Sequence, residues 1–196
     1  MKKSFWKTLA GNWNTKTVVG VAIGAALFGV LMNFGSIKVF TNTNLTTAML
    51  IPVIVGGMFG PLPALVATGV GNVIADLIGG WGLWFDWSIG NAVLGLFVGA
   101  LPLYGAKIEE GIFTVKHMII YAVLCILGNA LAFGIVTPIF STILYQSELT
   151  ITFMQSLTGG LSNVAVLLIV GIPLLKLLAA RNARNNNLSA EDDVNE

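Results

Sequence analysis

The stretch Val18–Phe34 reads VVGVAIGAALFGVLMNF and carries no charged side chain, so it is long and apolar enough to cross a bilayer as a helix. Five more apolar runs follow it: Leu45–Met58, Leu62–Gly79, Trp87–Tyr104, Val115–Val136 and Thr152–Leu178. Together they predict an all-α membrane protein in which residues 17–179 form a domain of six transmembrane helices. Residues 1–16 are predicted to be a cytoplasmic N-terminal segment, and the polar residues 180–196 to be a disordered C-terminal tail.

The composition of the whole chain favours a bilayer environment. Of its 196 residues, 56% are hydrophobic and 10% are charged, and the mean hydropathy is +0.86. A soluble domain carries about 25% charged residues, so this chain has too few charges to cover a surface in water. Six helices of ~20 residues and the charged ends leave no room for a catalytic soluble domain. The net charge of +1 gives no electrostatic support for binding nucleic acid.

The positions of the basic residues predict the orientation. If the N-terminus lies inside, every Lys and Arg except Lys38 falls on the same side of the membrane. Basic residues concentrate in cytoplasmic loops, so both termini are predicted to be cytoplasmic in a multi-pass protein of the bacterial cell membrane. The outer side then carries three acids, Asp76, Asp86 and Glu148.

The second apolar run is short. A helix over residues 45–59 would be about 22 Å long, against a hydrocarbon core of ~30 Å, and Pro52 lies in its middle. Interrupted segments often mark the binding sites of transporters. The alternative is a tilted neighbour in a locally thin bilayer.

Polar side chains within the predicted helices gather toward the outer side. Those in the outer half are Asn72, Asp76, Asn91, Asn129 and Gln155, and Asn163 lies near the midplane. A channel needs polar groups along its whole length, whereas this pattern predicts a pocket that opens outward and is closed inward by apolar packing. The alternative is that the amides form hydrogen bonds between helices, worth about 0.6 kcal/mol each.

The connection before the fourth helix is rich in tryptophan. Trp81, Trp84 and Trp87 offer flat faces on which an aromatic or apolar ligand can stack, although an interfacial aromatic belt is the alternative. The connection Ser36–Asn44 is also predicted to be outer, and its polar residues, Asn44 among them, would form a lid or contact an anionic group of the ligand. An ordinary turn explains that connection equally well.

The first helix carries small residues at four-residue spacing. Gly20 and Gly24 form one such pair, and Ala22 and Ala26 form another. This spacing lets another helix approach closely, and two such faces favour a partner protein. Packing within the chain is the alternative.

Catalytic motifs are missing from the sequence. There is no GxxxxGK[ST] nucleotide loop, and Cys125 is the single cysteine. The stretch Gly160–Asn163 is only faintly similar to an intramembrane serine-protease motif, and no histidine follows it to act as a base. The lone histidine, His117, is predicted at the inner interface. The sequence therefore predicts no enzyme, no cofactor and no metal site.

The order of several short motifs resembles one family. They are TVVGVAIGAALF at Thr17–Phe28 with its Ala22-x-x-x-Ala26 motif, the turn Phe59–Pro61, GNVIAD at Gly71–Asp76, and the tryptophan-rich segment. From Lys16 to Ala180 the chain resembles the substrate-binding membrane subunits (S components) of energy-coupling factor (ECF) vitamin transporters.

The resemblance implies a subunit that binds a vitamin from outside with high affinity. It would dock through Gly20, Ala22, Gly24 and Ala26 onto a membrane coupling protein with two cytoplasmic ATPases, and topple to release its ligand inward. The members for cobalamin and for pyrimidine-type thiamin precursors are the most similar. The predicted ligand contacts are Asn44, Asn72, Asp76, Trp81, Trp84, Trp87, Asn91, Asn129 and Asn163.

Two other function classes remain open from the sequence. A stand-alone secondary transporter driven by protons or sodium would use Asp76 as its coupling acid. A structural assembly protein would bind no ligand at all.

Overall fold

The computed structural model describes the backbone of residues 2–40 and 43–192, and the side chains of residues 5–37 and 45–186. The helices are α1 (Lys2–Ala10), α2 (Thr15–Phe34), α3 (Leu50–Phe59), α4 (Pro61–Gly79), α5 (Phe85–Val98), α6 (Val115–Leu131), α7 (Thr137–Tyr145), α8 (Leu149–Val166) and α9 (Ile172–Asp192). Two strands, β1 (Ser36–Phe40) and β2 (Thr43–Thr46), pair antiparallel. Short 3-10 turns occupy Thr47–Met49, Leu101–Tyr104 and Ile108–Glu110, and π turns occupy Ala132–Val136 and Leu167–Gly171.

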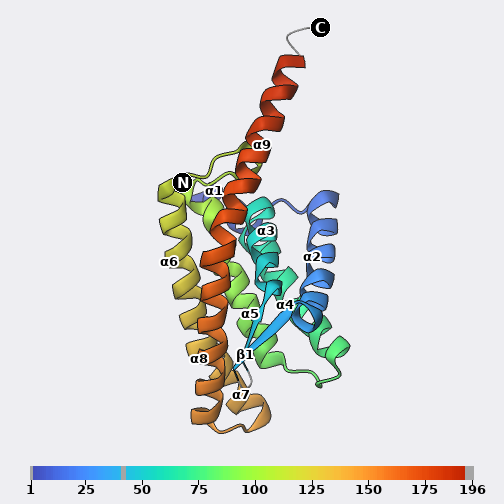
Figure 1. Ribbon diagram of the computed structural model, residues 1–196, viewed down its shortest axis with the longest axis vertical. Coiled ribbons are helices and arrows are strands. Elements are labelled where there is room, and N and C mark those ends of the chain that lie inside the picture. Colours follow the sequence, from blue (N-terminus) through green and yellow to red (C-terminus); the bar gives the residue numbers. More distant parts are fainter. Residues whose placement is uncertain (1, 41–42, 193–196) are drawn as a thin grey trace.

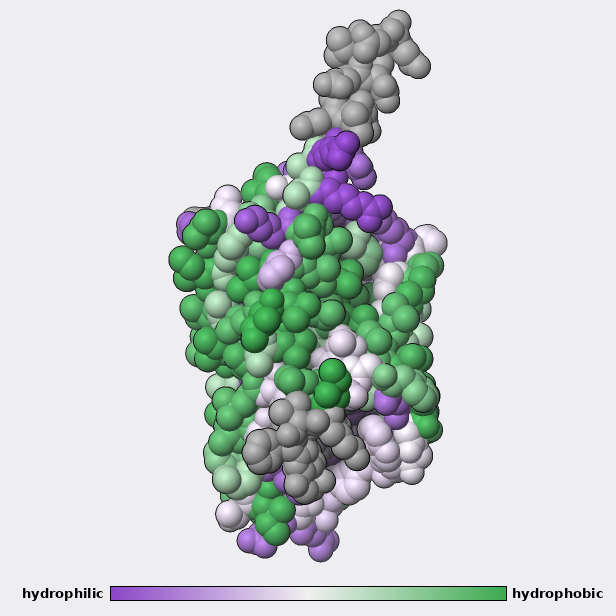
Figure 2. All heavy atoms as spheres, in the orientation of Figure 1, coloured by the Kyte–Doolittle hydropathy of each residue, from purple (hydrophilic) through white to green (hydrophobic). Residues whose placement is uncertain are grey.

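The described helices include five segments long and apolar enough to cross a bilayer. These are Thr15–Phe34, Pro61–Gly79, Phe85–Tyr104, Val115–Tyr145 and Leu149–Asn186, and the shorter apolar helix Thr47–Phe59 adds a sixth candidate. The predicted all-α membrane architecture is therefore confirmed, with five to six spans. Figure 2 shows a broad hydrophobic belt between two more polar ends.

The helix ends follow from local chemistry. Asn14 precedes α2, and its side chain accepts a hydrogen bond from the backbone N–H of Thr17 at 2.9 Å. The turn between α3 and α4 needs Gly60, whose φ is +97°, followed by Pro61 at the first position of α4. His117 caps α6, because its Nδ1 accepts a hydrogen bond from the backbone N–H of Thr114 at 3.2 Å.

The predicted second helix over Leu45–Met58 was too long. Its first part is strand β2 and a 3-10 turn, and α3 begins only at Leu50. Pro52 therefore sits in the first turn of α3, where a missing backbone N–H costs no helical hydrogen bond. The connection before it, expected as a lid or turn, is the hairpin β1–β2.

The prediction of a disordered tail from residue 180 was wrong for the described residues, because α9 continues to Asp192. Two amides secure it. Asn182 donates to the carbonyl of Ile108 at 2.9 Å, and Asn186 donates to that of Glu109 at 3.2 Å. Figure 1 shows α9 rising out of the bundle as its longest projection. The N-terminal segment, for which no helix was predicted, forms α1.

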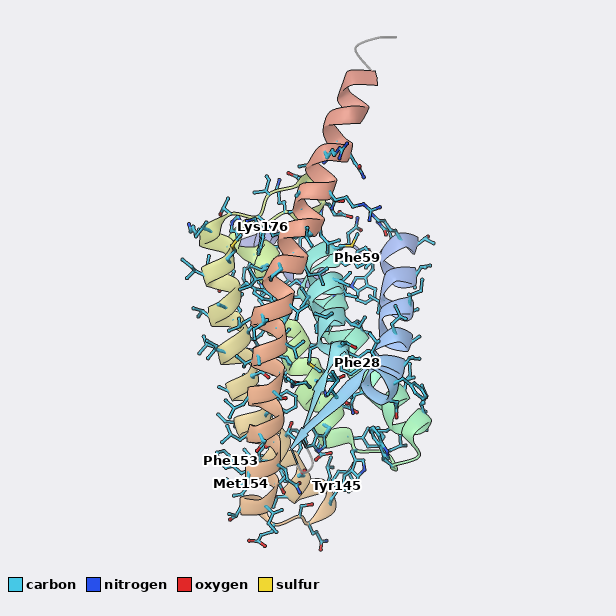
Figure 3. The ribbon with its side chains drawn as sticks, in the orientation of Figure 1. Phe28, Phe59, Tyr145, Phe153, Met154 and Lys176 are labelled. Carbon is cyan, nitrogen blue, oxygen red and sulfur yellow. The ribbon has the colours of Figure 1, made fainter. Side chains whose placement is uncertain are left out.

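The bundle has two distinct ends (Figure 1). We call the end with α1 and the projecting part of α9 the terminal end, and the end with α7 and the α4–α5 connection the cavity end. Lys176 lies toward the terminal end and Tyr145 at the cavity end (Figure 3). Both described termini thus lie on one side of the bundle, as an even number of spans requires.

Candidate functional site

A cavity of about 800 Å³ opens at the cavity end. Its described lining residues come from the hairpin, from five helices and from the turns and connections between helices: Met32, Ser36, Thr46, Met49, Asn72, Asp76, Trp81, Trp84, Trp87, Asn91, Phe133, Ser141, Ser147, Glu148, Ile151, Thr152, Gln155, Gly159 and Asn163. This size suits a small organic ligand. Eleven of these nineteen residues have polar side chains, and the other eight include the three tryptophans.

The structure brings together seven of the nine predicted ligand contacts. Asn72, Asp76, Trp81, Trp84, Trp87, Asn91 and Asn163 all line this cavity. The side chain of Asn44 lies outside the described residues, as does that of Lys38. Asn129 is buried in α6 away from the cavity, and its Nδ2 donates to the carbonyl of Cys125 at 2.8 Å. Whether the seven bind a ligand remains a prediction.

Several lining residues were not predicted. Met32, Ser36, Thr46 and Met49 come from the end of α2 and from the hairpin region, which the sequence did not reveal as a structured element. Glu148, Thr152 and Gln155 lie at the start of α8. The sequence carried a signal for Gln155, since its depth in the outer half had been recognised.

The amides of α4 and α5 form a buried network in the cavity wall. Asn91 Nδ2 donates to Asn72 Oδ1 at 3.0 Å and to the carbonyl of Trp87 at 3.1 Å. Asn72 Nδ2 donates to Ser88 Oγ at 3.1 Å. Both amides are almost fully buried, and the Oδ1 atom of Asn91 has no hydrogen-bond partner among the described residues. An unpaired buried acceptor is costly, which makes it a candidate for a ligand contact.

Asp76 organises the tryptophan-rich connection. The α4–α5 turn passes through Gly80 and Gly82, both with positive φ, and then returns so that Asp76 Oδ2 accepts the backbone N–H of Trp84 at 2.9 Å. Trp84 Nε1 donates to the carbonyl of Trp81 at 2.9 Å. The carboxylate therefore fixes the backbone that carries two of the three indoles.

Tyr145 at the end of α7 holds the same connection from the other side (Figure 3). Its hydroxyl donates to the carbonyl of Leu83 at 2.9 Å and accepts from the backbone N–H of Phe85 at 2.8 Å. Its ring lies 4.9 Å from that of Trp84. The third indole, Trp87, is partly buried and packs on Phe133 at 5.7 Å between ring centroids. Trp81 and Trp84 are 53% and 39% exposed, so their faces are available at the cavity mouth.

A second carboxylate is buried beside the cavity. Asp86, in the first turn of α5, is fully buried, and its Oδ2 accepts a hydrogen bond from the hydroxyl of Ser141, a cavity-lining residue on α7. Its Oδ1 has no partner among the described residues. The sequence had placed Asp86 on the outer side without assigning it a role.

Toward the terminal end the polar lining gives way to an apolar core. Leu94 and Val98 on α5, Val53 on α3 and Leu167 and Leu175 after α8 are buried against one another. Tyr121 crosses this layer, and its hydroxyl donates to the carbonyl of Leu167 at 3.2 Å. The cavity thus ends within the bundle on a packed hydrophobic layer.

The two small-residue faces of α2 have different surroundings. A Cβ at Gly24 would lie 2.8 Å from Val55 Cγ2, and one at Gly20 would lie 2.4 Å from the ring of Phe59, so this pair packs on α3 within the chain. Ala22 and Ala26 are exposed on the opposite face. Of the four predicted docking residues, only this second pair is therefore accessible to a partner.

The site contains no candidate for metal binding, since no cluster of three or more His, Cys, Asp or Glu side chains occurs among the described residues. It combines stacking surfaces, amides and carboxylates in a cavity that opens at one end of a membrane bundle. Such a combination suits a small ligand with both flat and polar parts.

Comparison with known proteins identifies the family of the chain. The family model described as the S component of ECF-type riboflavin transporters matches residues 12–180. The chain belongs to this family: it is an ECF transporter S component, a non-enzymatic multi-pass protein of the cell membrane. The resemblance drawn from the sequence is thereby confirmed. Membership implies a vitamin ligand and the ECF module as partner.

Relatives extend over nearly the whole chain. A UPF0397 protein of Vibrio vulnificus is 38% identical over 91% of this chain and 98% of its own length. A UPF0397 protein of Streptococcus pneumoniae is 32% identical over 90% of this chain and 96% of its own. The crystal structure of FolT bound with folic acid shares the fold, with a TM-score of 0.59 and 18% identity over 86% of this chain and 96% of that one.

Proposed function

We propose that this S component binds a vitamin with a planar nitrogen heterocycle in the 800 Å³ cavity, with the cavity end facing outward. The observation that carries the proposal is the convergence of three indoles and two buried amides on one cavity. Indole faces stack on flat rings, and amides and carboxylates hydrogen-bond the ring edges. The family description names riboflavin, whose ring system has this chemistry, so riboflavin is the first compound to test.

Of the two ligand classes suggested by sequence, the flat pyrimidine type fits this proposal. Cobalamin is bulky and not flat, so stacking between neighbouring indoles would not hold it. The outward orientation rests on the basic residues: Lys16, Lys107 and Arg181 lie at the terminal end, and cations favour the cytoplasmic side.

Delivery inward would require the partners. The apolar layer of Leu94, Val98 and Leu167 leaves no polar path between cavity and terminal end in the described residues. We propose that Ala22 and Ala26 dock on a membrane coupling protein that is attached to two ATPases. Movement of the whole subunit would then release the ligand inward.

The binding test is calorimetric titration of the purified full chain with riboflavin, thiamin and cobalamin. We expect saturable binding of one flat-ring compound and none of cobalamin. The double variant Trp84→Ala, Asp76→Asn should bind that compound at least about thirtyfold more weakly, since a stacking partner and a charged hydrogen-bond acceptor are both lost. The matched control is Trp13→Ala, Glu109→Gln at the terminal end, which should bind normally. Equal affinity in both double variants would contradict the site.

The transport test separates this proposal from a self-sufficient transporter. Liposomes that contain the chain alone should not accumulate the vitamin under a proton or sodium gradient. Liposomes that also contain the coupling protein and ATPases should do so with ATP. Accumulation by the chain alone would favour the ion-coupled alternative, in which Asp76 is the coupling acid.

A further inference from the structure

The charged side chains that line the cavity are all of one sign in the part of the chain that the structure describes. The described lining residues include two carboxylates, Asp76 and Glu148, and no Lys, Arg or His. The carboxylate of Asp86 lies directly behind the lining, bonded to Ser141. A ligand that enters the cavity therefore meets acids without a compensating cation among the described residues.

Helix N-termini, which favour anions, do not reverse this picture. Three helices begin at the cavity: α3, α5 and α8. The start of the 3-10 turn that leads into α3 has no carboxylate, but the hydroxyl of Thr46 accepts the N–H of Ala48 there. The starts of α5 and α8 each have a carboxylate of the protein. Asp86 lies in the first turn of α5, and Asp76 accepts the N–H of Trp84, the residue that precedes this helix. Glu148 precedes α8 directly. The positions that would attract a phosphate or carboxylate of the ligand are occupied by side chains of the chain itself.

The hydrogen-bonding groups agree with the charges. Both hydrogens of Asn91 Nδ2 are used within the protein, on Asn72 Oδ1 and on the carbonyl of Trp87. The amide therefore has no free N–H for a ligand, and its unpaired Oδ1 atom is covered by the surrounding described residues. Asp76 has one oxygen, Oδ2, bonded to Trp84, and a carboxylate can accept only. Asn91 and Asp76 therefore provide no free donor to a ligand, whereas Gln155 and Asn163 on α8 carry amides that can donate and accept.

From these three observations we infer that the site selects vitamins that are neutral or cationic and carry N–H or O–H donors, and that it rejects their phosphate esters. This inference rests on the proposed function and specifies the substrate class of the same cavity. A phosphate adds nearly two negative charges at neutral pH. Those charges would face Asp76 and Asp86, which are buried, so that Coulomb repulsion is weakly screened. They would also face Glu148, which is exposed at the start of α8.

The test is titration of the full chain with two matched pairs: riboflavin and riboflavin 5′-phosphate, and thiamin and thiamin monophosphate. In the pair whose parent compound binds, the phosphate should bind at least about tenfold more weakly. A variant that removes a charge but keeps the size of the side chain separates electrostatic repulsion of the phosphate from its steric exclusion. Glu148→Gln should reduce the ratio between the dissociation constants of the phosphate and the parent compound about threefold or more. Glu109→Gln at the terminal end should leave this ratio unchanged.

Three results would overturn the inference. The first is equal binding of a parent compound and its phosphate. The second is tighter binding of the phosphate that is lost in Lys38→Ala, since this would make Lys38 an anion contact. The third is an affinity difference between parent compound and phosphate that Glu148→Gln does not change, which would show that the phosphate is excluded by its size. If neither member of either pair binds, the proposed function fails too, and that outcome is distinct from the other three.

Discussion

The two halves of the bundle use the same helices for opposite purposes. At the cavity end α4 and α5 face each other through Asn72 and Asn91, joined by a hydrogen bond. Toward the terminal end the same two helices are packed so closely that a Cβ at Gly99 would lie 2.9 Å from the Cβ of Ala64. Thr68 marks the change, since its hydroxyl donates to the carbonyl of Asn91 at 2.8 Å and also bonds within α4. Polarity here varies with depth along a helix as well as around it.

This comparison teaches what each half contributes. The close-packed half provides a rigid base of small residues and large apolar side chains. The polar half keeps its groups apart around a space of about 800 Å³. Changes in the first half should therefore affect folding, and changes in the second should affect ligand binding with the fold retained.

The largest effect is expected in the close-packed half. A Cβ at Gly56 would lie 2.4 Å from the backbone Cα of Gly99, so Gly56→Ala forces α3 and α5 apart. We expect a loss of about 3 kcal/mol or more in the free energy of unfolding, measured by thermal or denaturant unfolding in detergent. Gly134→Ala is the matched control, because its Cβ would meet nothing within 4 Å. Gly134→Ala should be as stable as the unmodified protein. If Gly56→Ala were equally stable, the close packing of this half would not be needed for folding.

The next largest effect should fall on transport. Ala26→Trp adds a large side chain to the exposed face of α2, so vitamin uptake by the assembled transporter should fall to background while calorimetric affinity stays unchanged. The contrasting variant is Gly24→Ala, which crowds Val55 inside the chain and should lower stability by about 1 kcal/mol. Normal uptake with Ala26→Trp would show that this face does not dock.

The smallest effect should come from Tyr145→Phe. The change keeps the ring against Trp84 but removes the hydrogen bonds with Leu83 and Phe85. Each bond contributes about 1 kcal/mol and both lie at an exposed position, so affinity should fall only a few-fold, with faster dissociation. Stopped-flow release measures this. A Tyr145→Phe dissociation rate equal to that of the parent would show that the α4–α5 connection needs no anchor on α7.

The sequence predicted the spans and seven of the nineteen described lining residues of the cavity, because both depend on depth in the membrane. Hydropathy reports which residues cross the bilayer, and the positions of Asn72, Asp76 and Asn91 along their helices put them at one level. The depth of a residue does not show whether its side chain reaches the cavity or is covered by a neighbouring side chain. Asn129 lies at a suitable depth, yet Phe133, four residues further along, takes the place in the cavity wall.

Features that depend on contacts distant in sequence could not be predicted. The hairpin β1–β2 forms through pairing between Ser36 and Thr46, and it displaces the start of α3. Residues after 180 continue α9, and Asn182 there is bonded to Ile108, 74 positions earlier. The two faces of α2 looked alike in sequence, because nothing in the spacing says which face meets α3.

The tryptophans allow the most direct test of the cavity as the vitamin site. Trp81, Trp84 and Trp87 line the cavity, whereas Trp6 and Trp13 lie in and just after α1 at the terminal end. Quenching of tryptophan fluorescence by riboflavin should be retained in the variant Trp6→Phe, Trp13→Phe. It should be largely lost in Trp81→Phe, Trp84→Phe, Trp87→Phe, where calorimetry still detects binding. Quenching that survives the triple change and disappears with the double one would place the ligand at the terminal end and contradict the account.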